Sequence, residues 1–281
     1  MNTSGYQLID SGDQLKLERF GAFVLTRPAS QAVWPRRNLA TWHKVDASFE
    51  RNSSGSGNWR IESTLPPCWS MQYFNFTFTL RPNEHGNVGI FPEQEPCWSW
   101  IIATVKAVAP PIKSFDVLNL FGYTGGSTLA ALAAGANVVH VDASRTSVQA
   151  ARENVAASGL GDRSVRWIVE DAGKFVEREL RRARRYHGIV LDPPSYGRGT
   201  NGEIWQIERD LVPLLANCQR LLHEDARFLL LTSHTPGFTP LVLANLLEAP
   251  SGVAADCGEM LLRDTRERAL PSGAFARWRR T

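Results

Sequence analysis

The sequence predicts an α/β fold: a mostly parallel sheet that ends in an antiparallel hairpin, preceded by a small β-rich domain. From about residue 112, short apolar runs alternate with helical patterns, which is typical of a parallel sheet. Acidic residues follow three of these runs. Upstream, aromatic and β-branched residues form short runs between turn residues, which favours strands. The expected domains are residues 1–92 and 93–281.

The first domain contains several strand-like runs and many tryptophans. The runs are YQLID, KLERF, AFVLTRP, WRIES and the alternating segment MQYFNFTFTL at 71–80. Six of the nine tryptophans lie in the first 100 residues: Trp34, Trp42, Trp59, Trp69, Trp98 and Trp100. We favour a role in filling a small core over an exposed aromatic surface that stacks on nucleobases.

The second domain alternates strands and helices until its last segment. Strands are expected at 115–120, 137–141, 165–169, 186–191 and 227–231, and helices at 127–134, 145–158, 174–185, 204–222 and 239–247. The tail, 252–262 and 273–278, reads as two strands joined by a turn at 268–272. Because no helix separates them, they form an antiparallel hairpin.

A glycine-rich segment, NLFGYTGGS at 119–127, follows the first strand of this domain. Glycines at that position let the backbone turn sharply and approach a ligand. Their spacing differs from the GxGxxG pattern that seats a pyrophosphate. Because Tyr-Thr follows Gly122, the loop suits a ligand without phosphates.

Three aspartates end consecutive strands: Asp142, Asp171 and Asp192. Asp142 lies 20 residues after Gly122, where an acid accepts hydrogen bonds from ribose hydroxyls, and Asp171 is placed to meet an adenine edge. The carboxyl ends of parallel strands gather at one edge of a sheet, so a ligand site is expected there. The alternative is that these acids only cap the following helices.

Residues 192–198 read Asp-Pro-Pro-Ser-Tyr-Gly-Arg. Two prolines fix the backbone and remove two N–H donors, so we expect carbonyls and the Asp192 carboxylate to line an acceptor-rich pocket. Tyr196 can stack on a planar group. The arrangement suits a nucleobase, although a simple turn also uses Pro-Pro.

Together, NLFGYTGGS, HVDAS, VEDA and VLDPPSYGRG resemble the class I S-adenosylmethionine-dependent methyltransferases. Within that class, the sequence is most similar to bacterial enzymes that methylate bases of large-subunit ribosomal RNA. The resemblance covers about residues 90–281. It implies a Rossmann-like sheet with a reversed last strand, S-adenosylmethionine as cofactor, and RNA, with ribosomal RNA favoured, as partner.

The resemblance also implies roles for individual residues. Phe121, Gly122, Tyr123 and Gly125 line the methionine end of the cofactor, Asp142 binds ribose, and Asp171 with Ala172 binds adenine. Asp192, Pro193, Pro194 and Tyr196 are the expected catalytic residues around the acceptor base, with Asp192 also near the cofactor. Glu93 and Gln94 lie near the donor.

The acceptor atom is expected to be nitrogen rather than carbon 5 of a pyrimidine. Similar enzymes that methylate carbon 5 use a cysteine, placed in the Pro-Pro loop or after the fifth strand. Here these places hold Ser195 and the segment 231–234 (LTSH), and serine is a poor nucleophile without a dedicated base. Asp192 is the expected proton acceptor; His234 is an alternative, although a structural role is favoured for it.

Composition places few limits on the partner. A net charge of +3 tolerates a polyanion without requiring one. The four cysteines show no metal spacing, so no metal and a reducing compartment are expected. No signal peptide or apolar span is visible, which favours a cytoplasmic protein without membrane association. The arginines at 178, 181, 182, 184 and 185 form either a solvated surface or a phosphate-binding face.

Other functions remain open from sequence alone. The same pocket would accept a small molecule or a protein amide. A non-catalytic RNA-binding module with a vestigial donor pocket is another alternative. A NAD-dependent oxidoreductase is disfavoured, because it has no use for Asp-Pro-Pro-Ser-Tyr and prefers GxGxxG.

Overall fold

The computed structural model describes residues 5–52, 56–107, 114–199, 202–251 and 254–280. The chain forms two compact units. The first comprises Met1–Glu93 and Leu261–Pro271, and the second comprises Gln94–Met260 and Ser272–Thr281. The predicted α/β class with a β-rich N-terminal region is confirmed. By contacts, the tip of the terminal hairpin groups with the first unit.

The first unit is built from a five-stranded sheet and a separate hairpin. The sheet has the order β1-β2-β3-β4-β5, with β1 (Tyr6–Gly12), β2 (Leu15–Phe20), β3 (Phe23–Pro28), β4 (Ala47–Arg51) and β5 (Gly57–Ile61). The alternating run 71–80 is not one strand but two, β6 (Trp69–Tyr73) and β7 (Phe76–Leu80). Phe74 and Asn75 between them have positive φ angles of 51° and 62°, as a tight two-residue hairpin turn requires.

The tryptophans of this unit are held by hydrogen bonds from their indole nitrogens. Trp34 donates to the oxygen of Ser11 at 2.9 Å, and Trp42 to the carboxylate of Asp10 at 2.9 Å. Two more donate to main-chain oxygens: Trp59 to Asn83 and Trp69 to Phe20. These bonds hold the rings in place; Trp42 is buried, and the other three are half-buried. Trp98 and Trp100 belong to the second unit.

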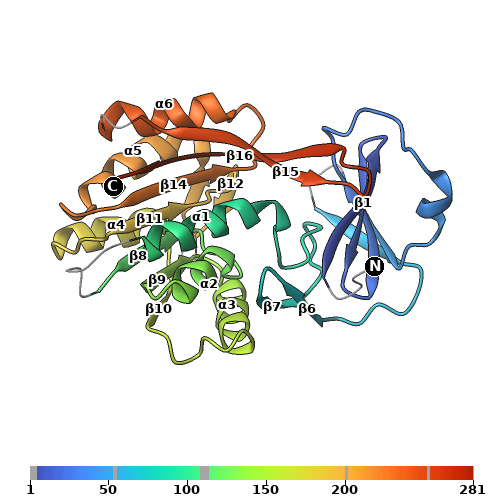
Figure 1. The fold of residues 1–281 in the computed structure, drawn as a ribbon, viewed down its shortest axis with the longest axis horizontal. Coiled ribbons are helices and arrows are strands. Elements are labelled where there is room, and N and C mark those ends of the chain that lie inside the picture. The colour runs from blue at the N-terminus through green and yellow to red at the C-terminus, as the bar shows by residue number, and fades with distance from the viewer. Residues whose placement is uncertain (1–4, 53–55, 108–113, 200–201, 252–253, 281) are drawn as a thin grey trace. The chain divides into compact units, whose positions relative to one another are not determined.

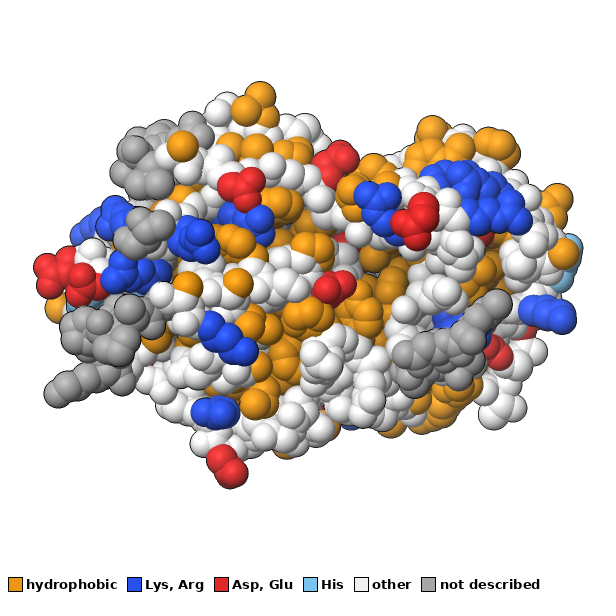
Figure 2. Space-filling view, viewed as in Figure 1, with side chains coloured by type: hydrophobic (Ala, Val, Ile, Leu, Met, Phe, Trp, Pro, Cys, Tyr) orange, Lys and Arg blue, Asp and Glu red, His pale blue; other side chains and the backbone are white. Residues whose placement is uncertain are grey.

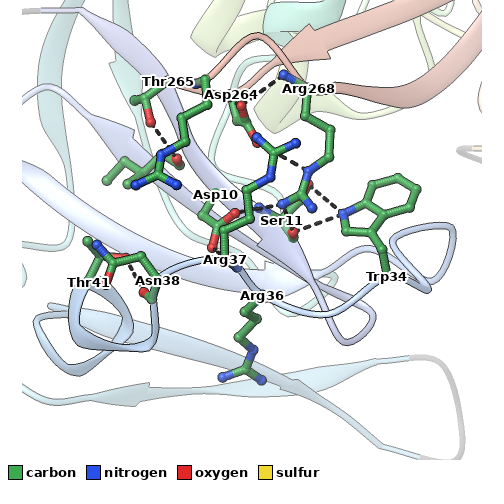
Figure 3. A network of polar contacts seen from close by, with 12 residues as sticks. Asp10, Ser11, Trp34, Arg36, Arg37, Asn38, Thr41, Asp264, Thr265 and Arg268 are labelled. Carbon is green, nitrogen blue, oxygen red and sulfur yellow. Dashed lines mark hydrogen bonds and ion pairs between the residues drawn. The ribbon is translucent and has the colours of Figure 1, made fainter.

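A polar network ties the residues between the last two strands into the first unit (Figure 3). Arg268 donates to Asp10 at 2.8 Å and to Asp264 at 3.3 Å, and both carboxylates are buried. Leu262 and Leu270 pack in one apolar cluster with Leu8. The first unit is therefore completed by residues from the end of the chain.

The second unit contains a seven-stranded sheet in the order β10-β9-β8-β11-β14-β16-β15 (Figure 1). Its first five strands are parallel, and β16 is antiparallel to β14. The bounds are β8 (Asp116–Leu120), β9 (Asn137–Asp142), β10 (Val165–Val169), β11 (Gly188–Leu191), β14 (Phe228–Ser233), β15 (Asp256–Arg263) and β16 (Ala269–Arg279). The reversed strand is confirmed. The predicted turn at 268–272 is wrong, because β16 already begins at Ala269.

Six α-helices of the described chain cover this sheet. They are α1 (Glu95–Lys106), α2 (Gly126–Ala133), α3 (Arg145–Ala157), α4 (Ala172–Arg181), α5 (Ile207–Arg220) and α6 (Pro240–Ser251). Contacts group α1, α2 and α3 in one layer and α4, α5 and α6 in another (Figure 1). Helix α1 lies outside the helices predicted from the sequence.

The predicted helix 204–222 is wrong at its start. Ile204–Gln206 forms β13, which pairs with β12 (Tyr196–Arg198), and α5 begins only at Ile207. The Asp210 carboxylate accepts a hydrogen bond from the main-chain N–H of Gln206 at 2.8 Å, which marks the helix start. The hairpin β12–β13 therefore follows the Pro-Pro segment directly.

Candidate active site

The candidate site lies at the carboxyl edge of the parallel strands. Strand β8 is flanked by β9 on one side and β11 on the other, so the chain reverses its winding there. Open α/β sheets bind ligands at such a switch point. The residues predicted from the sequence reach this edge from four neighbouring strands: the loop 121–126 after β8, Asp142 at the end of β9, Asp171 after β10 and Asp192 after β11.

The glycine loop is shaped by its protein neighbours. The N–H of Gly122 donates to Val141 at 3.0 Å, and a Cβ at Gly122 would lie only 2.6 Å from Nδ1 of His140. Any side chain would therefore displace a buried ring. Phe121 and Tyr123, on either side of Gly122, have positive φ angles of 55° and 46°, whereas Gly122 itself does not. The glycine is needed here because the ring of His140 leaves no room for a Cβ.

A buried polar network that the sequence did not predict supports this loop. Asn119 donates to Oγ1 of Thr128 at 2.9 Å, and that hydroxyl lies 2.9 Å from Nδ1 of His140. All three side chains are buried. Burial lowers the pKa of His140 to about 3, so the ring is neutral at physiological pH. The network joins β8, α2 and β9 beneath Gly122.

Asp142 joins two loops at the edge. Its Oδ2 accepts from the N–H of Tyr123 and its Oδ1 from the N–H of Ser144, both at 2.8 Å. Burial is the main cause that raises its pKa. A carboxylate oxygen has two acceptor positions, so each can take a further bond from a ribose hydroxyl.

Asp171 does cap a helix, as the alternative interpretation predicts. Its Oδ1 accepts from the N–H of Lys174 at 3.0 Å at the start of α4. Ala172, the first residue of that helix, is buried. Capping uses one of the acceptor positions of the carboxylate, so this role and contact with an adenine edge are compatible.

Asp192 is held by two buried side chains. Thr232 donates to Oδ1 at 2.7 Å, and Gln94 donates to Oδ2 at 3.0 Å and to Thr232 at 3.2 Å. Nδ1 of His234 lies 3.6 Å from Oδ1. The sequence analysis expects Gln94 near the donor, which stays a prediction; its contact with Asp192 and the role of Thr232, the next-to-last residue of β14, are new. Glu93 is buried in the first unit.

Two carbonyls of the Pro-Pro segment accept hydrogen bonds from the hairpin that follows it. The oxygen of Pro194 accepts from the indole of Trp205 at 2.7 Å, and that of Ser195 accepts from the N–H of Ile207 at 3.1 Å. Each oxygen has a second acceptor position, so an acceptor-rich pocket at this segment stays a prediction. Pro193 is buried, and Tyr196 is 51% exposed.

All four cysteines lie in the described part of the chain, and the two nearest the core are unreactive thiols. Cys97 in α1 and Cys218 in α5 are buried, which raises the pKa of Cys97 to about 12 and that of Cys218 further. Cys68 belongs to the first unit and Cys257 to β15. One group of side chains in the described residues has its ligand atoms close enough together to bind a metal ion. It lies in a turn before β14 and comprises His223, Glu224 and Asp225.

The arginine run lies along α4 and the turn that follows it. Helix α4 begins beside Asp171 and extends 10 residues, or about 15 Å, toward the amino ends of the strands. Arg178 pairs with Glu170 and Arg182 with Glu179, whereas Arg181, Arg184 and Arg185 are exposed. Figure 2 shows several Lys and Arg side chains on this side of the unit. The run is separate from the residues around Asp192.

The residues at the carboxyl edge fit a nucleoside that carries a cationic sulfur and an amino-acid end. Three carboxylates favour a positive charge, and Asp142 retains acceptor positions for a ribose. Helix α2 has Gly125 as its N-cap, with no side chain to accept from the first-turn amides. These amides and the helix dipole suit the carboxylate of a methionine.

Comparison with known proteins gives a consistent result. Residues 36–250 match the model of a family described as S-adenosylmethionine-dependent methyltransferases. The crystal structure of the S-adenosylmethionine-dependent methyltransferase from Agrobacterium tumefaciens is 37% identical, with a TM-score of 0.91, and the match covers 98% of this chain and 90% of that one.

Two curated relatives carry the name ribosomal RNA large subunit methyltransferase K/L. The protein from Shewanella sediminis is 30% identical over 217 residues, which is 76% of this chain and 28% of the relative. The protein from Shewanella woodyi is 30% identical over 154 residues, which is 54% of this chain and 20% of the relative. The matched regions therefore span only 20% to 28% of the length of these relatives.

Proposed function

This chain belongs to the S-adenosylmethionine-dependent methyltransferase family, and we propose that it methylates a nitrogen of an RNA base, with ribosomal RNA as the favoured substrate. The relatives named as ribosomal RNA methyltransferases support RNA as the acceptor. The family match removes the NAD-dependent alternative. No described helix is long and apolar enough to cross a membrane. A ribosomal RNA substrate implies action in the cytoplasm.

The cofactor-binding residues are those named from the resemblance. Phe121, Gly122, Tyr123 and Gly125 hold the methionine end, Asp142 binds the ribose, and Asp171 with Ala172 binds the adenine. When bound, S-adenosylmethionine supplies a methyl group that its positively charged sulfur has already activated. The residues of the chain therefore need only to orient the acceptor in line with that methyl group and exclude water.

The fixed carboxylate of Asp192 is the observation that carries the nitrogen proposal. Thr232 and Gln94 each occupy one position on its oxygens, so the remaining positions point in a defined direction. Asp192 accepts a hydrogen bond from the N–H of the acceptor and so aims the nitrogen lone pair at the methyl carbon. With S-adenosylmethionine bound, the acceptor nitrogen would take the methyl group, the sulfur would leave as a neutral thioether, and Asp192 would take the proton that the nitrogen loses.

His234 and Tyr196 complete the acceptor side. His234 is 31% exposed at its side chain and lies 3.6 Å from Asp192, so it can pass the proton on to water. Tyr196 supplies an exposed ring that stacks on the base. Carbon-5 chemistry is disfavoured because it needs a thiolate, and burial holds Cys97 and Cys218 as thiols.

The test is incorporation of labelled methyl groups from S-adenosylmethionine into purified RNA, protein and small-molecule fractions of a bacterial lysate. We expect label in ribosomal RNA, on a base that mass spectrometry of nucleosides identifies as N-methylated. Label in a carbon-methylated pyrimidine would overturn the nitrogen assignment. Label only in protein or small molecules, or none in any fraction, would overturn RNA as substrate or catalysis itself.

A further inference from the structure

We propose that the outward face of the hairpin β12–β13 binds the single-stranded RNA segment beside the methylated nucleotide, with Arg198 on a phosphate and Ile204 against a base. This inference rests on the proposed function. We call this surface the docking face and define it by Tyr196, Arg198, Ile204 and Gln206.

The register of the hairpin determines which side chains face outward. Tyr196 pairs with Gln206, Gly197 with Trp205, and Arg198 with Ile204. Side chains alternate between the two faces of a strand pair, so the residues of the docking face share one side. All four are exposed, whereas Trp205 on the opposite side is buried. The hairpin therefore has one face toward the protein and one toward solvent.

Trp205 determines which face of the hairpin is turned toward solvent. Its ring packs against Phe121 with centroids 4.9 Å apart, and its indole donates to Pro194. A shift of one residue in register would expose this indole and bury the Arg198 guanidinium. The outward direction of Arg198 and Ile204 is thus set by the same contact that anchors the Pro-Pro segment.

Among the described residues Arg198 has no acidic partner, unlike Lys174, Arg178 and Arg209. Lys174 pairs with Glu203, Arg209 with Asp210, and Arg178 with Glu170. Within the ranges that the structure covers, no hydrogen bond, ion pair or ring contact holds the guanidinium of Arg198. Its charge is therefore available to an anion without first breaking an ion pair.

The docking face also exposes two large apolar side chains next to that charge. Tyr196 is 51% exposed and Ile204 is 49% exposed. A free cation between apolar and aromatic groups matches the alternation of phosphate and base along a single strand. A protein partner would instead favour a wider apolar surface with its charges at the rim.

Spacing along the strand suits adjacent nucleotides. Tyr196 and Arg198 are two residues apart on one face, or about 6.6 Å. Because Tyr196 is assigned to the acceptor base, Arg198 and Ile204 come next along the RNA. In this arrangement Arg198 adds affinity for the phosphate backbone of the RNA. Ile204 packs against the flanking base, which must be unstacked from its neighbour in the RNA.

The experiment measures binding of a fluorescein-labelled single-stranded RNA of mixed sequence, about 15 nucleotides long, by fluorescence anisotropy over a range of KCl concentrations. We compare the wild-type protein with Arg198→Ala, Arg198→Lys and Ile204→Ser. Arg163→Ala, which removes an exposed arginine from the loop before β10, is the matched control. Binding of S-adenosylhomocysteine, measured by calorimetry, verifies that each variant is folded.

Arg198→Ala is expected to weaken RNA binding and to reduce the slope of log K against log[KCl] by about 0.7, the value for one phosphate contact on a single strand. Arg198→Lys should restore the slope, because it retains the charge. Ile204→Ser should weaken binding with no change in slope. Arg163→Ala should match the wild type.

An unchanged slope and affinity for Arg198→Ala would overturn the docking face while wild-type RNA methylation still stands. A wild-type protein that binds S-adenosylhomocysteine but neither binds nor methylates RNA would instead overturn the proposed function. An equal loss of affinity in Arg198→Ala and Arg163→Ala would show that overall charge alone attracts the RNA, which also contradicts the inference.

Discussion

The indole Nε1 of Trp205 donates a 2.7 Å hydrogen bond to the main-chain oxygen of Pro194. The same ring packs against Phe121 in the glycine loop. One side chain thus contacts both the segment assigned to the acceptor base and the loop assigned to the cofactor. The distance between these two segments governs whether acceptor and methyl group meet in line.

Replacing Trp205 by phenylalanine keeps an aromatic ring but removes the N–H donor. We expect kcat for RNA methylation to fall about fivefold, because one hydrogen bond that orients the acceptor segment contributes roughly 1 kcal/mol. Affinity for S-adenosylhomocysteine, measured by calorimetry, should change less than about threefold. Trp100→Phe in α1, which also keeps a ring, is the control. Equal kcat values for Trp205→Phe and wild type would contradict this role.

Substitutions around Asp192 test the proton-acceptor assignment. Asp192→Ala should abolish methyl transfer while affinity for S-adenosylhomocysteine stays within about tenfold of wild type. Thr232→Val removes one donor to the carboxylate and should lower kcat by roughly tenfold, with Thr232→Ser largely restoring it. Asp225→Asn, in an exposed turn, serves as the control. If Asp192→Ala lost donor binding and transfer in equal measure, a role in cofactor binding would replace the one proposed.

Gly122→Ala should destabilise the protein because the added methyl group meets the buried ring of His140. We expect the free energy of unfolding to fall by about 1–3 kcal/mol, as for other overpacked sites. Gly161→Ala is the matched control, since its nearest neighbour, Cα of Ala156, would be 3.9 Å away. Urea unfolding followed by circular dichroism measures both. The steric account fails if the two variants are equally stable.

The buried His140 makes stability depend on pH. Its pKa is about 3 in the folded protein and 6.5 as an ordinary value, so the unfolded chain binds a proton that the folded chain does not. Above pH 6.5 the ring is neutral in both states, and the full stability is present. As the pH falls from 6.5 toward 3, protonation of the unfolded chain lowers the free energy of unfolding by up to about 1.4 kcal/mol per pH unit. Urea midpoints between pH 7 and pH 4.5 should therefore fall more steeply for wild type than for His140→Gln. The exposed His85→Gln should follow wild type, and parallel curves for all three proteins would exclude His140 as the cause.

The cysteines offer a chemical test of the acceptor chemistry. Ellman's reagent should react quickly with the exposed Cys68, more slowly with the half-buried Cys257, and with Cys97 and Cys218 only after unfolding. Denaturation in guanidinium should release all four thiols. Rapid modification of Cys97 in the native protein, together with loss of methyl transfer, would reopen carbon-5 chemistry.

The strand-end acids and the glycine loop could be predicted because each depends on residues close in sequence. An apolar run followed by Asp142 or Asp192 is sufficient to place the carboxylate at the edge of a parallel sheet. The hairpin β12–β13 could not be predicted in this way. Ile204 and Trp205 fit a helical pattern locally, and the contact with the distant Phe121 decides between helix and strand.

Buried polar groups were the other features that the sequence did not reveal. Thr232, Asn119 and His140 each lie in an apolar run. The hydrophobic pattern of such a run predicts a strand, but it does not indicate what a polar residue within the strand contacts. Their function depends on partners from other strands and helices, such as Gln94 for Thr232. Gln94 itself was identified through family resemblance, because nothing in its local pattern indicates that it meets Asp192.

The discontinuity of the first unit has a consequence for biosynthesis. Its polar network needs Asp264 and Arg268, and its apolar cluster needs Leu262 and Leu270. A growing chain that has emerged only as far as residue 93 holds Asp10 without Arg268 and Leu8 without two of its neighbours. The β-rich unit therefore reaches its final stability only after residues 261–271 have also been translated, when the intervening α/β unit has already been made.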